Sequence, residues 1–251
     1  MAPRKNLFSE HEGEADISIW KEALCATEFF LLHASPVFYG LGIPHGDQSA
    51  VVLIPGFLGN DRYLLQLHSW LERIGYRPYL SGIAVNAECP NLLIRHCLAG
   101  TIRRARSETE RKVHLIGHSL GGIMARSLAG QQPEDIASVI TLGAPFRGTV
   151  LHQTVRNAAA AVRQSILKEH GQRVMPECYT TRCTCDFLNH LRCEMPASVR
   201  QTAIYTPNDG VVDWRYCRTG NGDVDFEVPG THIGLVFNAS AYRIIARRLA
   251  E

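Results

Sequence analysis

The stretch KVHLIGHSLGG (residues 112–122) ends an apolar run with three glycines around one serine. Its pentapeptide GHSLG has the G-x-S-x-G pattern, in which a strand turns sharply into a helix with the serine at the apex. Small residues on both sides of the apex avoid a steric clash at such a turn. The apolar run predicts a strand before Ser119 and a helix after it, so Ser119 is a candidate nucleophile. An ordinary glycine-rich turn is the alternative, and we interpret the adjacent His118 as structural.

The pattern of strand, turn and helix recurs on both sides of this stretch. Short, nearly continuous apolar runs predict strands that are buried on both faces, as in a parallel sheet. Between them lie longer segments with helical periodicity. The alternation predicts an α/β fold with a mostly parallel central sheet and helices on both faces. The predicted strands lie within 49–56, 77–83, 112–117, 136–143, 200–206 and 224–228, and the predicted helices within 17–32, 62–75, 89–108, 119–131, 150–171 and 235–249.

The domain organisation follows from the same pattern. Residues 1–14 are polar and lack periodicity, which predicts a loose N-terminal tail. Residues 15–251 are then a single domain, of a size that buries a substantial core. The segment 150–199 is helical at first and afterwards irregular and cysteine-rich. We expect it to be an insertion, and we hypothesise that it covers the site as a lid or forms an acyl pocket.

Composition narrows the class of function. The 251 residues are 45% hydrophobic and 20% charged, with a net charge of +2, which gives no reason to expect nucleic-acid binding. The opening MAPRKNLFSEHEGEAD does not resemble a signal peptide. The most apolar run (residues 23–42) contains Glu28 and breaks at Pro36, so it does not predict a membrane span. We therefore expect a cytoplasmic protein, with peripheral membrane contact through the apolar helix at 20–32 as a further hypothesis.

A serine hydroxyl needs a general base and a group that orients the base. His232, in VPGTHIGLVFN (228–238), follows a predicted strand and a Pro-Gly turn, a position from which a base can reach across the end of a sheet. AIYTPNDGVVDW (203–214) leaves another strand and offers two acids. Asp209 lies just past the strand end and is favoured, with Asp213 as the alternative acid. The predicted catalytic residues are Ser119, Asp209 and His232.

The tetrahedral intermediate of acyl transfer needs backbone N–H donors for its oxyanion. One donor is expected from Leu120, directly after the serine. The other is expected from PGFLGND (55–61), the loop after the first strand, whose glycines allow the backbone to approach a substrate closely. We assign it to the N–H of Phe57, with Leu58 as the reserve.

These residues resemble, in chain order, the hallmark segments of the lipases and esterases of the α/β-hydrolase superfamily, bacterial lipases included. The resemblance covers most of residues 50–250, and it implies the α/β-hydrolase fold, the triad of Ser119, Asp209 and His232, and an oxyanion hole from Phe57 and Leu120. Pro55-Gly56 stands where the family has His-Gly, which changes a wall of the pocket. The segments are VVLIPGFLGND (51–61), VHLIGHSLGG (113–122), VITLGAPFRGT (139–149), IYTPNDGVVDW (204–214) and GTHIGL (230–235).

The expected activity is therefore cleavage of carboxylic esters through an acyl-enzyme, a step of lipid metabolism in a lipase. It requires no cofactor and no metal, and the expected partner is a small-molecule or lipid ester. An acyltransferase with the same triad and a non-catalytic binding protein on a hydrolase fold are the alternatives.

The eight cysteines allow three states. Cys178, Cys183, Cys185 and Cys193 cluster in CYTTRCTCDFLNHLRC (178–193), with His190 among them. The spacing is not a standard zinc signature. Free thiols, disulfides in an oxidising compartment and a structural zinc site therefore all stay open.

Overall fold

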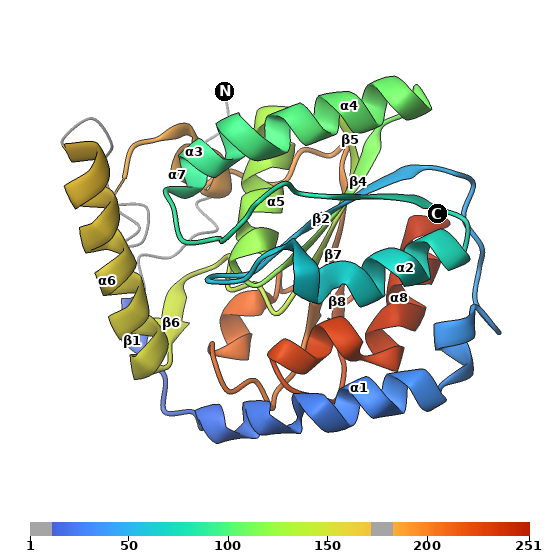
Figure 1. Ribbon diagram of the computed structural model, residues 1–251, viewed down its shortest axis with the longest axis horizontal. Helices are drawn as coiled ribbons and strands as arrows, with labels where there is room; N and C mark the ends of the chain where they lie inside the picture. The colour runs from blue at the N-terminus through green and yellow to red at the C-terminus, as the bar shows by residue number, and fades with distance from the viewer. Residues whose placement is uncertain (1–11, 172–182) are drawn as a thin grey trace.

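A parallel six-stranded sheet forms the centre of the computed structural model, which describes residues 12–171 and 183–251 (Figure 1). Every pair of neighbouring strands in this sheet is parallel, and the strand order is β3-β2-β4-β5-β7-β8. The predicted strands are confirmed: β2 (Ala50–Ile54), β3 (Arg77–Leu80), β4 (Val113–His118), β5 (Ile136–Leu142), β7 (Arg200–Tyr205) and β8 (Asp225–Glu227). All residues of β2 and β4 are buried, as expected for strands covered on both faces.

Helices cover both faces of the sheet and divide the core into two parts. One face packs against α4 (Ala99–Thr109), α5 (Leu120–Gln131) and α7 (Asp186–Leu191). The other face packs against α2 (Leu65–Arg73) and α8 (Ala239–Leu249). The alternation of side chains along β2 separates the two parts, because Val52 and Ile54 point to the first and Val51 and Leu53 to the second. The remaining helical segments that extend these layers are η3 (Asp61–Leu64), α3 (Pro90–Leu93), the π-helical η4 (Ile94–Leu98), η7 (Trp214–Cys217) and η8 (Ile233–Phe237).

The N-terminal segment runs along one edge of the molecule beside α8 and the loops before it (Figure 1). It consists of η1 (Ile19–Leu24), α1 (Cys25–Ala34) and η2 (Pro36–Tyr39). The apolar stripe that predicted this helix does not face the core, since Trp20, Leu24 and Leu31 are all exposed. The inward face carries Leu32 together with the carboxylates of Glu22 and Glu28. The segment thus presents several large apolar side chains to solvent and two carboxylates to the interior, unlike an ordinary amphipathic surface helix.

A second, two-stranded sheet joins the start of the described chain to the 150–199 segment. β1 (Glu12–Glu14) pairs in parallel with β6 (Thr149–Leu151). The prediction of a loose tail was therefore wrong for residues 12–14, because their backbone groups are used in strand pairing. Residues 1–11 and 172–182, the latter with Cys178, lie outside the described residues.

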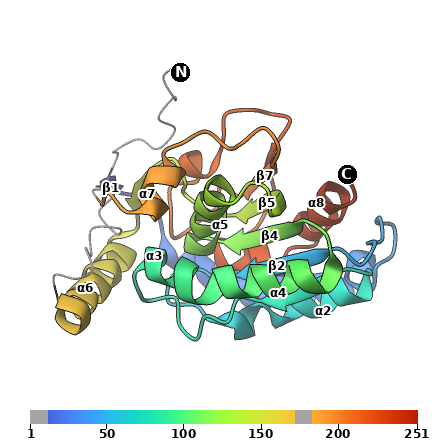
Figure 2. The same cartoon turned by 90° about the horizontal axis from the view of Figure 1, so that it is seen from above.

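The long helix α6 (Gln153–His170) stands at the end of the molecule toward which the strands point (Figure 2). The predicted helix at 150–171 is confirmed except for its first residues, which belong to β6. α7 follows in the second half of the cysteine-rich segment. None of the helices in residues 12–171 and 183–251 has the length and apolar character needed to cross a membrane.

Candidate active site

Ser119 occupies the sharp turn between β4 and α5. Its backbone angles, φ 51° and ψ −123°, lie in a region that residues with a side chain rarely adopt. A Cβ on Gly117 would overlap the backbone of Gly121, and a Cβ on Gly121 would overlap the carbonyl of Ile54. The turn is fixed from the neighbouring strand as well, because the N–H of Ser119 donates to the carbonyl of Leu142 at 2.8 Å. The geometry is that of a nucleophile at the apex of a strand–helix turn.

Asp209 and His232 come together from the loops after β7 and β8. The Nδ1 atom of His232 lies 2.6 Å from Oδ2 of Asp209, and both residues are buried. The other oxygen of Asp209 accepts the backbone N–H groups of Val211 and Val212, each at 2.8 Å. Asp213 instead caps η7, where it accepts the N–H of Arg215. The imidazole of His232 is thus paired with Asp209, whereas Asp213 caps η7.

The protonation of His232 follows from its partner. A carboxylate can only accept, so Nδ1 carries the proton and Nε2 of the neutral ring is left as the acceptor. Burial lowers the pKa of His232, but the charge of Asp209, their hydrogen bond and the charge of Glu22 together raise it above its ordinary value. Ser119 and His232 line the same pocket. No hydrogen bond joins their side chains within the described chain, and such bonds often tighten only when substrate binds.

The candidate oxyanion donors flank the same pocket. Leu120 is the first residue of α5, where backbone N–H groups point out of the helix and favour negative charge. In the loop after β2, the N–H of Gly56 donates to the hydroxyl of Tyr63 at 2.6 Å, and the N–H of Leu58 donates to the carbonyl of Asn86 at 2.9 Å. The reserve donor Leu58 is therefore engaged elsewhere. Phe57 lines the pocket beside Ser119, so its N–H stays the candidate.

A chain of hydrogen bonds that the sequence did not predict links the loop after β2 (residues 55–61) to His232. The hydroxyl of Tyr63 accepts from Gly56 and donates to Nδ1 of His118 at 3.0 Å. Nε2 of His118 then donates to the backbone carbonyl of His232 at 2.9 Å. Burial lowers the pKa of His118 to about 3, so its ring is neutral, as this pattern requires. His118 thus bridges the hydroxyl of Tyr63 and the main chain of His232.

Two carboxylates of the N-terminal segment hold the loops of the site from the other side. Glu22 accepts backbone N–H groups of Gly210, His232 and Ile233. Glu28 accepts the N–H of Thr231 at 2.8 Å and the Thr231 hydroxyl at 2.7 Å. Sequence analysis missed both residues. The available signal was two acids within the largely apolar run 19–32.

A pocket of about 480 Å³ opens at Ser119 and His232. Its lining is almost entirely apolar. One wall comes from α6, through Val155, Ala158 and Ala159, and another from α7, through Phe187, Leu188 and Leu191. Residues of the 150–199 segment therefore line the pocket at Ser119 and His232.

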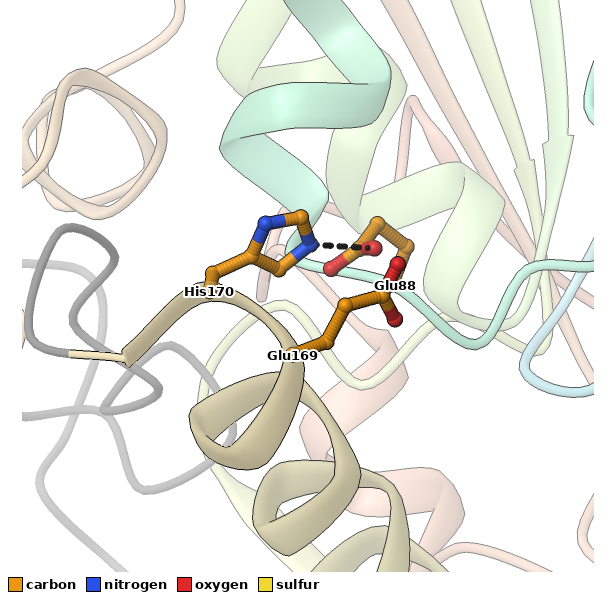
Figure 3. Close-up of side chains that lie close together, drawn as sticks. All are labelled: Glu88, Glu169 and His170. Atoms are coloured by element: carbon orange, nitrogen blue, oxygen red, sulfur yellow. Dashed lines mark hydrogen bonds and ion pairs between the residues drawn. The ribbon is translucent and has the colours of Figure 1, made fainter.

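A separate cluster ties the far end of α6 to the loop before α3 (Figure 3). Nε2 of His170 lies 3.0 Å from a carboxylate oxygen of Glu88, and this hydrogen bond raises the pKa of His170. With Glu169 these side chains place three ligand atoms within 4.8 Å of one another, a donor set that a divalent cation accepts. Sequence analysis missed this group. The cysteine cluster gives no comparable set in the described part of the chain, and Cys25, Cys97 and Cys217 are free thiols.

Comparisons with known proteins agree with this geometry. Residues 86–173 match the family described as PGAP1-like alpha/beta domain. A triacylglycerol lipase of Burkholderia plantarii is 29% identical over 124 residues, which cover 46% of this chain and 35% of that protein. A triacylglycerol lipase of Pseudarthrobacter phenanthrenivorans is 31% identical over 107 residues, covering 39% and 34%. The matched stretch thus spans about a third of the length of these relatives.

The solved structure of the Bacillus licheniformis lipase BlEst2 superimposes with a TM-score of 0.55 at 16% identity, covering 83% of this chain and 94% of that one. At this identity the superposition establishes the fold. The strand order, the strand–helix turn at Ser119 and the partial sequence similarity point to the same group of proteins. The chain has the α/β-hydrolase fold, and part of its sequence is similar to triacylglycerol lipases.

Proposed function

We propose that the protein is a serine hydrolase that cleaves carboxylic esters through an acyl-enzyme. The observation that carries the proposal is the convergence of Ser119 and the His232–Asp209 pair on one apolar pocket. Sequence similarity to triacylglycerol lipases supports an ester as the substrate.

The reaction follows from the placement of these groups. His232 takes the proton of Ser119 through Nε2 while the serine oxygen attacks the ester carbonyl. The N–H groups of Phe57 and Leu120 stabilise the oxyanion, and the imidazolium returns its proton to the departing alcohol. Water then enters, gives its proton to His232 and releases the acid. Asp209 holds the tautomer and stabilises the charge that His232 gains.

Covalent labelling tests this proposal. Purified protein is expected to react with a fluorophosphonate probe and to hydrolyse p-nitrophenyl esters, and Ser119→Ala is expected to lose both activities. Ser107→Ala is the control, because Ser107 is exposed on α4 and does not line the pocket. Absence of labelling in the folded wild type, or equal labelling of Ser119→Ala, contradicts the proposal.

The substrate class follows from the pocket and from the surface beside it. An almost wholly apolar pocket favours an acyl chain over a polar group, so we infer a lipid ester. The N-terminal segment exposes 84% of Trp20 and 72% of Phe30, together with Leu24 and Leu31. Ile19 of the same segment lines the pocket. An exposed apolar surface that adjoins the pocket of a lipid-ester hydrolase is suited to contact with a lipid surface.

Sedimentation with phosphatidylcholine vesicles tests the surface contact. The wild type is expected to sediment with the vesicles, and a variant with Trp20→Ser, Phe30→Ser and Leu31→Ser is expected to stay in solution. Leu167→Ser on α6 is the control, because Leu167 is exposed but lies outside the segment. Equal sedimentation of all three proteins would count against the contact, and a concentration-dependent dimer without vesicle binding would assign the surface to self-association.

A further inference from the structure

Glu22 is a buried carboxylate that forms no ion pair with an Arg or Lys among residues 12–171 and 183–251. Only 7% of the residue is exposed. The hydrogen-bond donors to its carboxylate in the described part of the chain are three backbone amides. Burying a carboxylate is costly unless its oxygens are fully hydrogen-bonded, so these amides account for its position.

The three amides belong to the two loops that carry the candidate acid and base. One oxygen of Glu22 accepts the N–H of Gly210 at 2.9 Å and the N–H of His232 at 3.1 Å. The other oxygen accepts the N–H of Ile233 at 2.8 Å. Gly210 follows Asp209 directly, so a single carboxylate fixes the main chain of both members of the pair relative to each other.

The main chain of His232 is consequently held on both sides. Glu22 accepts its N–H, and His118 donates to its carbonyl at 2.9 Å. Because the imidazole must present Nε2 to the serine within a fraction of an ångström, a residue that fixes this peptide governs the rate of proton transfer.

We propose that Glu22 is a positioning residue for the catalytic pair, a role that places the N-terminal segment inside the catalytic apparatus. The proposal rests on the proposed function. Glu22 acts through His232 and Asp209 rather than on the substrate, since it does not line the pocket.

The negative charge of Glu22 also affects the pKa of the His232 imidazole. The groups that face His232 are Asp209, Glu22 and His118. His118 is neutral, so the two charged groups that act on the ring are both negative, and both raise the pKa of His232. Neutralising Glu22 is therefore expected to lower the pKa of His232 and to move the acid limb of the pH–rate profile to lower pH, because the base must be unprotonated.

The experiment compares Glu22→Gln, Glu22→Asp and Glu28→Gln with the wild type. Glu22→Gln is expected to lower kcat for a p-nitrophenyl ester by about ten-fold or more, since a charged multiple hydrogen bond is weakened. KM should change little, and the acid limb should shift downward. Glu22→Asp keeps the charge but shortens the reach, so kcat should fall while the acid limb stays. Glu28→Gln is the matched control: it loses bonds to Thr231 alone, so its melting temperature should fall while the acid limb stays.

The pKa of His232, measured by NMR titration of labelled histidines and assigned with His232→Asn, makes the test independent of turnover. A lower His232 pKa in Glu22→Gln supports the proposal even if the wild type hydrolyses no ester, an outcome that overturns the proposed function alone. An unchanged kcat, acid limb and His232 pKa in a folded Glu22→Gln overturn the proposal. If Glu22→Gln does not fold, the kcat of Glu22→Asp is the deciding measurement. A kcat of Glu22→Asp equal to that of the wild type overturns the proposal.

Discussion

Asp209 carries out two tasks at the residue scale. One oxygen binds the imidazole of His232 and the other closes its own loop through the N–H groups of Val211 and Val212. Asp209→Asn keeps the shape but offers an amide that no longer fixes the correct tautomer. We expect kcat to fall about 10³- to 10⁴-fold. Asp213→Asn, four residues along the same loop, should retain nearly full activity, and steady-state kinetics of the two variants compares them directly. Equal losses would mean that the acid is misassigned.

The same pair sets a pH dependence of stability. The pKa of His232 is raised in the folded protein, so its pairing with Asp209 contributes stability that is fully present below the ordinary pKa of about 6.5. This contribution is lost as pH rises through the raised pKa. The loss of unfolding free energy caused by Asp209→Asn is therefore expected to be larger at about pH 6 than at about pH 9. Urea unfolding at both pH values measures it, and a loss that grows with pH would contradict the sign.

At the scale of elements, α6 forms one wall of the pocket with small side chains. Ala159 lines the pocket, whereas the next residue, Ala160, is exposed and does not. Ala159→Phe is expected to fill part of the cavity and to shift preference toward shorter acyl chains, by about ten-fold or more in the ratio of kcat/KM values. Ala160→Phe is the control. A series of p-nitrophenyl esters of graded chain length measures this ratio. If kcat/KM depends on chain length in the same way in both variants, α6 does not contact the acyl chain.

The far end of α6 is expected to respond to pH. The hydrogen bond to Glu88 raises the pKa of His170, so the ion pair is present at about pH 6 and is lost as pH rises through the pKa of His170. Amide exchange in the last turn of α6, corrected for intrinsic rates, should therefore increase between about pH 6 and pH 9. His170→Gln should abolish the increase. Helix α8 contains no histidine and serves as the internal reference.

At the scale of the whole molecule, Trp70 joins the N-terminal segment to the core. Its ring packs against Tyr242 of α8 at 4.4 Å between centroids, and its N–H donates to the carbonyl of Val37 at 2.8 Å. Trp70 is fully buried, so Trp70→Ala is expected to lower the unfolding free energy by about 3–5 kcal/mol. Trp20→Ala, at an exposed position, should change it by less than about 0.5 kcal/mol. Denaturant unfolding of the two variants provides the comparison.

The sequence predicts the strands and the turn at Ser119, because neighbouring residues alone determine these features. Buried apolar runs identified the strands, and the glycines around Ser119 identified its turn, because a two-sided sheet and a sharp turn constrain neighbouring residues directly. The choice between Asp209 and Asp213 needed the structure, since both follow β7. The hydrogen bonds of Glu22 and Tyr63 could not be predicted, because their partners lie far away in the sequence. Such contacts produce no local or periodic pattern of residues.

The inward-facing Glu22 also bears on how the protein is made. Its partners lie 188 to 211 residues further along the chain, so this contact forms only when late segments have emerged from the ribosome. At ordinary elongation rates Ser119 is synthesised roughly ten seconds before His232. We therefore expect Ser119 of a nascent chain to lack its proposed base, so that reactivity toward a fluorophosphonate begins only when the first and last thirds of the polypeptide meet.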